Sequence, residues 1–259
     1  MATSARTGFG PWVQALAFFT FVGEITLLLI DALRRMFRRP WEVRETVQQM
    51  AFIGAASVPI VGLTNFFSGA VLALYSTELM TRYGATSFVG GTVGLAIARE
   101  IGPVLAGIMV AARCGSAMAA QIGTMAVTEQ IDALKMLSVH PTNYLVLPRV
   151  VACVVMLPIL ALVGIYAGVT GGWMVAMAGG VPSGVFVQSL QQYVEPWDFV
   201  GGVLKTPVFG AIIALVACQQ GLRTRNGAVG VGQATTQTVV ISMVLVYVAN
   251  YFLAEVLYR

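Results

Sequence analysis

Apolar residues fill five long segments of this chain, and shorter polar stretches separate them. The segments cover about residues 47–79, 88–112, 146–177, 200–221 and 236–257. A helix needs about 20 predominantly apolar residues to cross a bilayer, so each segment is long enough to span one. Within lipid, a helix satisfies its own backbone hydrogen bonds inside one segment. The pattern therefore predicts an all-α integral membrane protein with five transmembrane helices.

The first and third segments are longer than a straight span requires. Pro59 lies within the first segment and Pro158 within the third. A proline removes a backbone donor and crowds the preceding turn, which kinks a helix. We therefore expect the first span to be tilted or kinked, with the kink at Pro59.

The apolar segment at residues 12–33 differs from the other five. Gln14, Glu24 and Asp31 interrupt it, and arginines follow at positions 34, 35, 38 and 39. Anionic lipids of the cytoplasmic leaflet attract such a cluster by about 1 kcal/mol per charge. We interpret this segment as an interfacial helix, with a true transmembrane helix as the open alternative. Residues 1–259 would then form a single domain, with this helix and a basic linker at 1–45 and the transmembrane core at 46–259.

The positions of lysine and arginine predict the orientation of the chain. If the N-terminus is cytoplasmic, only Arg82 and Arg259 fall on the outer side of the spans. Cytoplasmic segments of membrane proteins carry the excess of lysine and arginine, which favours this orientation. Residues 113–145 and a loop at 222–235 would be cytoplasmic, and a loop at about 179–199 would lie outside. The cations that would lie on the cytoplasmic side are Arg34, Arg35, Arg38, Arg39, Arg44, Arg113, Lys135, Arg149, Arg223 and Arg225.

Composition supports the membrane assignment and excludes several classes of protein. Hydrophobic residues make up 58% of the chain and charged residues 10%, whereas about a quarter of an average soluble domain is charged. The three cysteines lie apart and the only histidine is His140, so no metal site is expected. No GxxxxGK[ST] motif is present to bind nucleotide phosphates. We expect neither an enzyme, nor a cofactor, nor a nucleic-acid partner.

Polar residues inside three of the spans fall at similar depth. Arg99 and Glu100 are adjacent, so on a helix they point about 100° apart and each needs its own partner. Pro103 removes the donor that the Arg99 carbonyl would use. Counting about 1.5 Å per residue from the expected inner boundary places Glu100 at roughly 20 Å, Lys205 at roughly 27 Å and Asn250 at roughly 22 Å. The sequence therefore predicts a polar layer in the outer half of the membrane, suited to a lipid headgroup.

Two alternatives remain for this layer. Lys205 could extend to the outer interface, as long cationic side chains do in membranes. Arg99 and Glu100 could instead belong to a network between helices with a purely structural role.

A second candidate site lies between the second and third spans. We expect a short cytoplasmic helix there that docks on an ATPase through acidic and apolar side chains. Its candidate residues are Glu129, Gln130, Asp132, Leu134 and Leu137. The spacing to the leucines at 145 and 147 resembles the EAA loop of ABC importer permeases, although Lys135 stands where that loop has glycine. The alternative is a solvated connector helix.

The chain resembles the MlaE (YrbE) family of lipid-trafficking ABC permeases, most clearly in REIGPVLAGIMVAARCGSAMAAQIGTMAVTEQIDALKMLSVHP at residues 99–141. The likeness continues in VLPR at 146–149, GGVLKTPVFG at 201–210 and GQATTQTVV at 232–240. The resemblance implies a homodimer in the inner (plasma) membrane, an MlaF-like ABC ATPase subunit and an MlaD-like MCE-domain protein as partners. It also implies a pocket for phospholipid near Arg99, Glu100 and Lys205, to which we add Asn250 and, as apolar lining, Leu74 and Tyr75.

The resulting expectation is the membrane-spanning subunit of an ABC transporter that moves phospholipid or a related lipid between the inner membrane and a periplasmic MCE protein. Two other functions remain open. Glu100 could serve a stand-alone secondary transporter as a proton-linked carboxylate. The chain could also be a structural membrane anchor for a complex.

Overall fold

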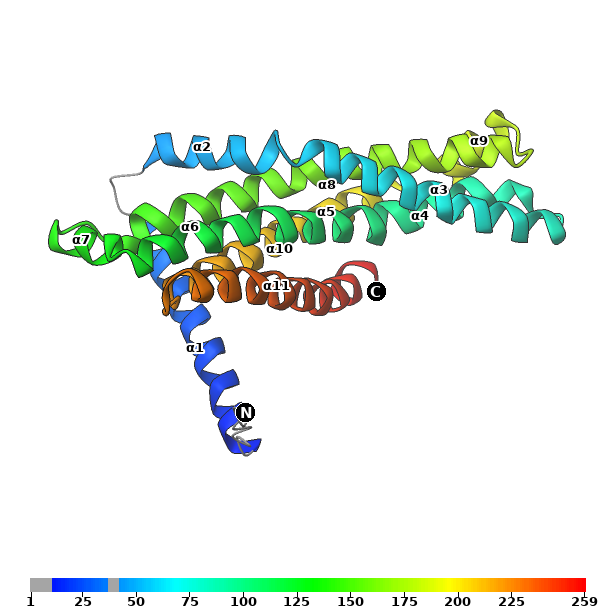
Figure 1. Cartoon of the computed structure of the whole chain (residues 1–259). Helices are drawn as coiled ribbons and strands as arrows, with labels where there is room; N and C mark the ends of the chain where they lie inside the picture. The colour runs from blue at the N-terminus through cyan, green and yellow to red at the C-terminus, as the bar shows by residue number, and fades with distance from the viewer. Residues whose placement is uncertain (1–10, 37–41) are drawn as a thin grey trace, which may run out of the picture.

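The computed structural model describes residues 11–36 and 42–259. All of the regular secondary structure in these residues is helical (Figure 1). The helices are α1 (Pro11–Met36), α2 (Val43–Gly54), α3 (Val58–Arg82), α4 (Val89–Ala96), α5 (Gly102–Val110), α6 (Ser116–Val127), α7 (Gln130–Met136), α8 (Leu147–Ala178), α9 (Ser183–Tyr193), α10 (Pro196–Leu222) and α11 (Gly227–Tyr258). A short 3₁₀ turn covers Thr86–Phe88, and π-helical turns cover Ile97–Ile101, Ala111–Gly115 and Thr142–Val146.

The predicted all-α membrane fold is confirmed. Within the described residues, five helical segments are long and apolar enough to span a membrane: Val43–Arg82, Thr86–Val127, Thr142–Ala178, Pro196–Leu222 and Gly227–Tyr258. α8 lies at the centre of the bundle, where α2, α3, α5 and α10 pack against it. The largest apolar cluster fills the space between these helices and includes Leu157, Leu160, Phe209 and Ile213.

The first span is broken rather than bent at Pro59. α2 ends at Gly54 and α3 begins at Val58, so Pro59 stands in the first turn of a new helix. A proline has no N–H for the carbonyl four residues earlier, which here belongs to Ala55. Without this hydrogen bond the first helix ends before the proline, at Gly54. The predicted kink site at Pro59 is therefore a few residues too far along the chain.

The second and fifth spans are longer than predicted at the end of the molecule that carries α7 (Figure 1). We call this end the inner end and the opposite end the outer end, after the orientation predicted from the sequence. Residues expected to be a wet segment after Arg113 form α6, whose Met118, Ala119 and Ile122 are fully buried. α6 is rich in alanine, serine and glycine, so α10 and α11 can approach it closely. The expected loop at 222–235 is also wrong, because α11 already begins at Gly227.

The outer end of the molecule contains a helix where we expected a loop. α9 lies within residues 179–199 and folds back along α4. A side chain at Gly90 would meet the Phe186 carbonyl oxygen at 2.1 Å, so glycine is required for this contact. The Gly91 N–H donates to the Ser189 hydroxyl at 2.9 Å. In Figure 1, the ends of α3, α4, α8 and α9 extend beyond the C-terminus of α11.

α1 projects away from the bundle near its inner end (Figure 1). Its Glu24 accepts a hydrogen bond from Gln219 at 2.8 Å and lies 3.4 Å from Arg223. Further along, Arg35 pairs with Asp31 at 2.8 Å and contacts His140 at 3.4 Å. Partial burial raises the pKa of Asp31, but Thr142, Arg35 and His140 outweigh it, and the net shift is downward. The interfacial placement of α1 stays a prediction, which its direction in Figure 1 supports.

A labelling experiment tests this placement. The three native cysteines are first replaced, and a single cysteine is then introduced at Thr7 or at Arg38. Both positions lie outside the described residues. We expect a membrane-impermeant thiol reagent to reach both positions only from the cytoplasmic side, because an interfacial helix keeps both of its ends on one side. Labelling of Thr7→Cys from outside would show that α1 crosses the membrane.

Candidate functional site

A cavity of about 680 Å³ opens between α3, α5 and α11 in the outer half of the bundle. Most of its wall is apolar, and its polar groups gather on one side. The lining residues are Phe67, Ser68, Val71, Leu72, Tyr75, Glu100, Ile101, Val104, Leu105, Tyr247 and Asn250. An apolar space with a few convergent polar groups is the usual form of a small-molecule site.

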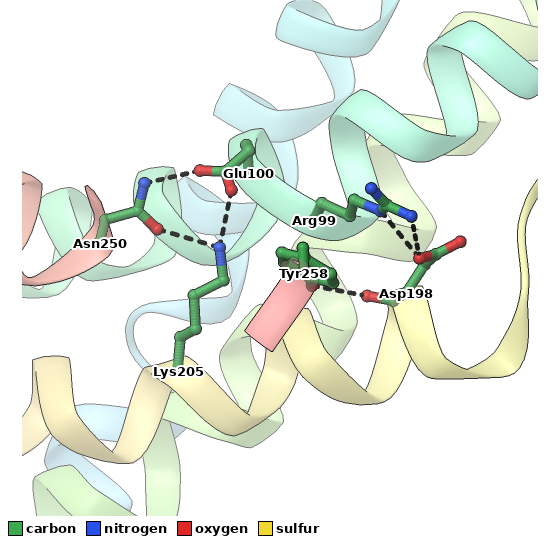
Figure 2. Close-up of polar contacts among 6 residues, drawn as sticks. All are labelled: Arg99, Glu100, Asp198, Lys205, Asn250 and Tyr258. Carbon is green, nitrogen blue, oxygen red and sulfur yellow. Dashed lines mark hydrogen bonds and ion pairs between the residues drawn. The ribbon is translucent and has the colours of Figure 1, made fainter. Parts of the chain in front are cut away.

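Three of the predicted residues meet at the polar side of this cavity (Figure 2). The Lys205 ammonium donates to Glu100 Oε1 at 2.8 Å and to the Asn250 side-chain oxygen at 3.2 Å. The Asn250 amide donates to Glu100 Oε2 at 2.6 Å. The structure thus confirms that Glu100, Lys205 and Asn250 share one depth, and it places them in direct contact.

Local backbone features bring these side chains together. Glu100 lies in the π-helical turn Ile97–Ile101, three residues before Pro103, which has no backbone N–H to donate. Such turns are frequent at functional sites because they redirect side chains. A side chain at Gly202 would meet the Ala98 carbonyl oxygen at 2.0 Å, so glycine lets α10 touch this turn. Lys205, almost one helical turn further along α10, then reaches Glu100.

Arg99 belongs to a separate network on the other side of the same turn (Figure 2). Its guanidinium pairs with Asp198 at 2.6 Å and lies 4.6 Å from the centre of the Tyr258 ring. The Tyr258 hydroxyl donates to the Asp198 backbone carbonyl at 3.1 Å. Asp198 also accepts from the Glu195 N–H at 2.9 Å and so caps the first turn of α10. Arg99 and Glu100 therefore have different partners, as predicted.

The burial of Lys205 decides one of the open alternatives. Its side chain is 0% exposed, so it does not extend to the outer interface. An ammonium group without water needs a partner, since burying an unpaired charge costs several kcal/mol. Glu100 supplies that partner and stays about two-fifths exposed itself, with a side-chain exposure of 42%. The carboxylate thus faces the cavity, and the ammonium lies behind it.

The two apolar residues proposed for the lining separate in the structure. Tyr75 lines the cavity beside Glu100. Leu74 instead lines another cavity, of about 570 Å³, together with Glu78 and Val175. Neighbouring helical positions point about 100° apart, so both could not face the same space. The prediction for Leu74 as lining of this cavity was wrong.

Sequence reasoning missed two residues of the polar networks. Asp198 was placed in an outer loop, yet it is buried in α10 and pairs with Arg99. The sequence Glu-Pro-Trp-Asp at 195–198 has the spacing of a capping box with proline at the first helical position, which could have located the helix start. Tyr258 gave no comparable signal, because its role depends on where α11 ends relative to α10.

The second candidate site forms a short helix at the inner end. Glu129 has φ 60° and precedes α7, and Asp132 pairs with Lys135 at 2.8 Å. Leu134 packs inward beside a buried cluster, whereas Leu137 is 73% exposed. The surface of this segment therefore presents Glu129, Gln130, Asp132, Met136 and Leu137, with Met136 as an exposed residue that the sequence analysis had not included among the candidates.

The site combines a few hydrogen-bonding groups with a wide apolar wall. Among the described residues, no group of three or more His, Cys, Asp or Glu side chains could hold a metal ion. The polar side of the cavity offers hydrogen bonds, and the rest offers apolar surface. Such a site suits a molecule with a polar head and a long apolar part.

Comparisons with known proteins identify related membrane permeases. The family model described as Permease MlaE matches residues 46–256. A probable ABC transporter permease protein of Rickettsia conorii is 42% identical over 247 residues, which are 95% of this chain and 95% of that protein. One from Synechocystis is 38% identical over 257 residues, 98% of this chain and 95% of that protein. The chloroplastic protein TRIGALACTOSYLDIACYLGLYCEROL 1 of Arabidopsis thaliana is 37% identical over 217 residues, 83% of this chain and 62% of that protein.

Proposed function

The chain belongs to the MlaE permease family, and from this premise we propose that it carries phospholipid or a related lipid as the membrane-spanning subunit of an ABC transporter. It is a multi-pass membrane protein of the permease type. ATP would be hydrolysed on a separate ATPase subunit, and the lipid would be exchanged with a periplasmic MCE protein. The Arabidopsis relative supports a lipid as substrate, because that protein is named after a glycerolipid.

The cavity is the observation that carries this proposal. Its volume of about 680 Å³ lies within the range of roughly 300–1,000 Å³ for ligand pockets. Apolar side chains from α3 and α5 would contact acyl chains, while Glu100 and Asn250 would meet the headgroup. A water-soluble solute would leave most of this wall without suitable contacts.

A second copy of the chain would complete the site. Only 11% of the most apolar part of α11 is buried, compared with 61% for the span Thr86–Val127. α11 also leaves polar side chains of Gln233, Thr236 and Gln237 at the surface of its inner half. A homodimer packed along α11 would cover these groups and would enclose the open side of the cavity. We propose that arrangement in the inner membrane, with the N-terminus in the cytoplasm.

Filling the cavity tests the proposed function. Val71 and Leu74 lie on the same helix and are similarly exposed, at 52% and 55%, but only Val71 lines this cavity. We expect Val71→Trp to reduce co-purified lipid and lipid transport by about tenfold or more, because the indole would occupy acyl-chain space. Leu74→Trp is the matched control and should retain both. Mass spectrometry of bound lipid and transport between reconstituted vesicles measure the two effects.

The same preparations separate the other two functions. A secondary transporter would move its substrate as a lone chain driven by a proton gradient, without an ATPase. A structural anchor would keep lipid transport in its complex when Val71→Trp fills the cavity. Transport that needs the ATPase and is lost in Val71→Trp agrees only with the proposed function.

A further inference from the structure

The charges around the cavity are arranged so that its surface shows a carboxylate but not a cation. Glu100 and Asn250 line the cavity, and Lys205 lies behind them with no exposed surface. Both Glu100 oxygens are already hydrogen-bonded, to Lys205 and to Asn250, at 2.8 and 2.6 Å. The ion pair is therefore a dipole whose negative end faces the bound molecule. A phosphate group could reach the ammonium only by displacing Glu100.

The other cations of the outer half are also occupied. Within the described residues, each of them has a carboxylate partner: Arg82 with Glu78, Arg99 with Asp198, Lys205 with Glu100 and Arg259 with Glu255. Arg99 additionally lies against the Tyr258 ring and is not part of the cavity wall. An anionic headgroup would thus meet acceptors and hydroxyls where it needs a free cation.

We infer that the cavity selects lipids whose headgroup presents hydrogen-bond donors and carries no net negative charge, and that Glu100 is the residue that sets this selection. This inference rests on the proposed function. The ammonium of an ethanolamine headgroup and the hydroxyls of an uncharged sugar headgroup share the required chemistry. Either can donate to the free lone pairs of Glu100, and the hydroxyls of Ser68, Tyr75 and Tyr247 lie on the same wall. A glycerol phosphate headgroup has hydroxyls too, but its net charge meets the negative end of the dipole.

A competition experiment with the assembled transporter tests the inference. The protein is reconstituted in vesicles with equal amounts of phosphatidylethanolamine, phosphatidylglycerol and a monoglycosyl diacylglycerol with identical acyl chains. Lipid held by the purified protein is then quantified by mass spectrometry, and the amount held by Val71→Trp is subtracted as non-cavity lipid. We expect the cavity to hold about tenfold less phosphatidylglycerol than the proportion of this lipid in the vesicles would give. The ratio between the other two lipids shows whether ammonium or hydroxyl groups are preferred.

A substitution at Glu100 tests its role. Glu100→Gln keeps the size and one oxygen that can accept from Lys205, but it removes the negative charge and offers no second acceptor to the Asn250 amide, so the exclusion of phosphatidylglycerol should fall severalfold. Glu78→Gln removes an exposed carboxylate outside this cavity; its partner Arg82 does not line the cavity either, so the ratio should stay unchanged.

The outcomes separate the inference from the proposed function. Phosphatidylglycerol held at or above its share by the unmodified protein would overturn the inference, although lipid binding would stand. An exclusion that Glu100→Gln does not alter would overturn the assignment to Glu100. If the unmodified protein holds no more lipid of any class than Val71→Trp, the proposed function fails, and the inference fails with it.

Discussion

Replacing Glu100 with alanine should destabilise the protein by about 3–5 kcal/mol, which is the usual effect of removing one partner from a buried ion pair. Lys205 has no exposed surface in the intact protein, so after the change its charge loses its carboxylate partner and can be solvated only by water that enters through the cavity. Only the Asn250 side-chain oxygen at 3.2 Å and the Tyr258 ring at 5.1 Å would remain near the ammonium. We expect a lower thermal unfolding midpoint and partial loss of the assembled complex.

A double substitution separates this structural effect from lipid binding. Glu100→Ala combined with Lys205→Met removes both charges, and replacing both partners of a buried pair by apolar groups is often nearly neutral for stability. The double variant should regain most of the unfolding midpoint but should remain low in bound lipid. Wild-type stability in Glu100→Ala would contradict the burial argument. Normal lipid content in the stable double variant would show that the network is only structural.

The second large effect is expected at α7 and the residue before it. Replacing Glu129 with lysine should lower lipid-stimulated ATP hydrolysis by about tenfold or more, or should release the ATPase during purification. A reversed charge in the docking surface would face a like charge on the partner, and one decade in binding corresponds to about 1.4 kcal/mol. Glu129 is exposed, and among the described residues its side chain has no hydrogen bond or ion pair that would hold the fold.

Its control uses the same charge reversal at the opposite end of the molecule. Glu78→Lys alters an exposed carboxylate at the outer end of α3 and should leave ATPase binding and turnover intact. Co-purification of the ATPase and its rate with and without lipid are the measurements. If Glu129→Lys assembles and turns over as the unmodified protein does, α7 is a solvated connector and the coupling role belongs elsewhere.

The polar layer could be predicted because helix geometry fixes depth. A constant rise per residue placed Glu100, Lys205 and Asn250 at one level without any knowledge of packing, and the structure joins them by hydrogen bonds. Rotation around each helix is less determined by sequence in a membrane span, since lipid-facing and protein-facing residues are both apolar. This is why Tyr75 and Leu74 could not be told apart in advance.

The remaining differences come from where helices begin and end. α6 looked like an aqueous segment because its small residues are only weakly apolar, yet Ala119 and Gly123 are buried where α10 packs closely. Asp198 looked like a loop residue until the start of α10 at Pro196 was known. Such boundaries depend on contacts between distant parts of the chain, which periodicity does not report.

The pairing of outer cations with carboxylates also has an electrical consequence. Moving one elementary charge across the membrane potential is worth about 2.3 kcal/mol per 100 mV. Glu100 and Lys205 move as a pair when their helices move, as do Arg99 and Asp198, so their displacement transfers no net charge through the field. We therefore expect movement of the cavity wall to depend little on the membrane potential.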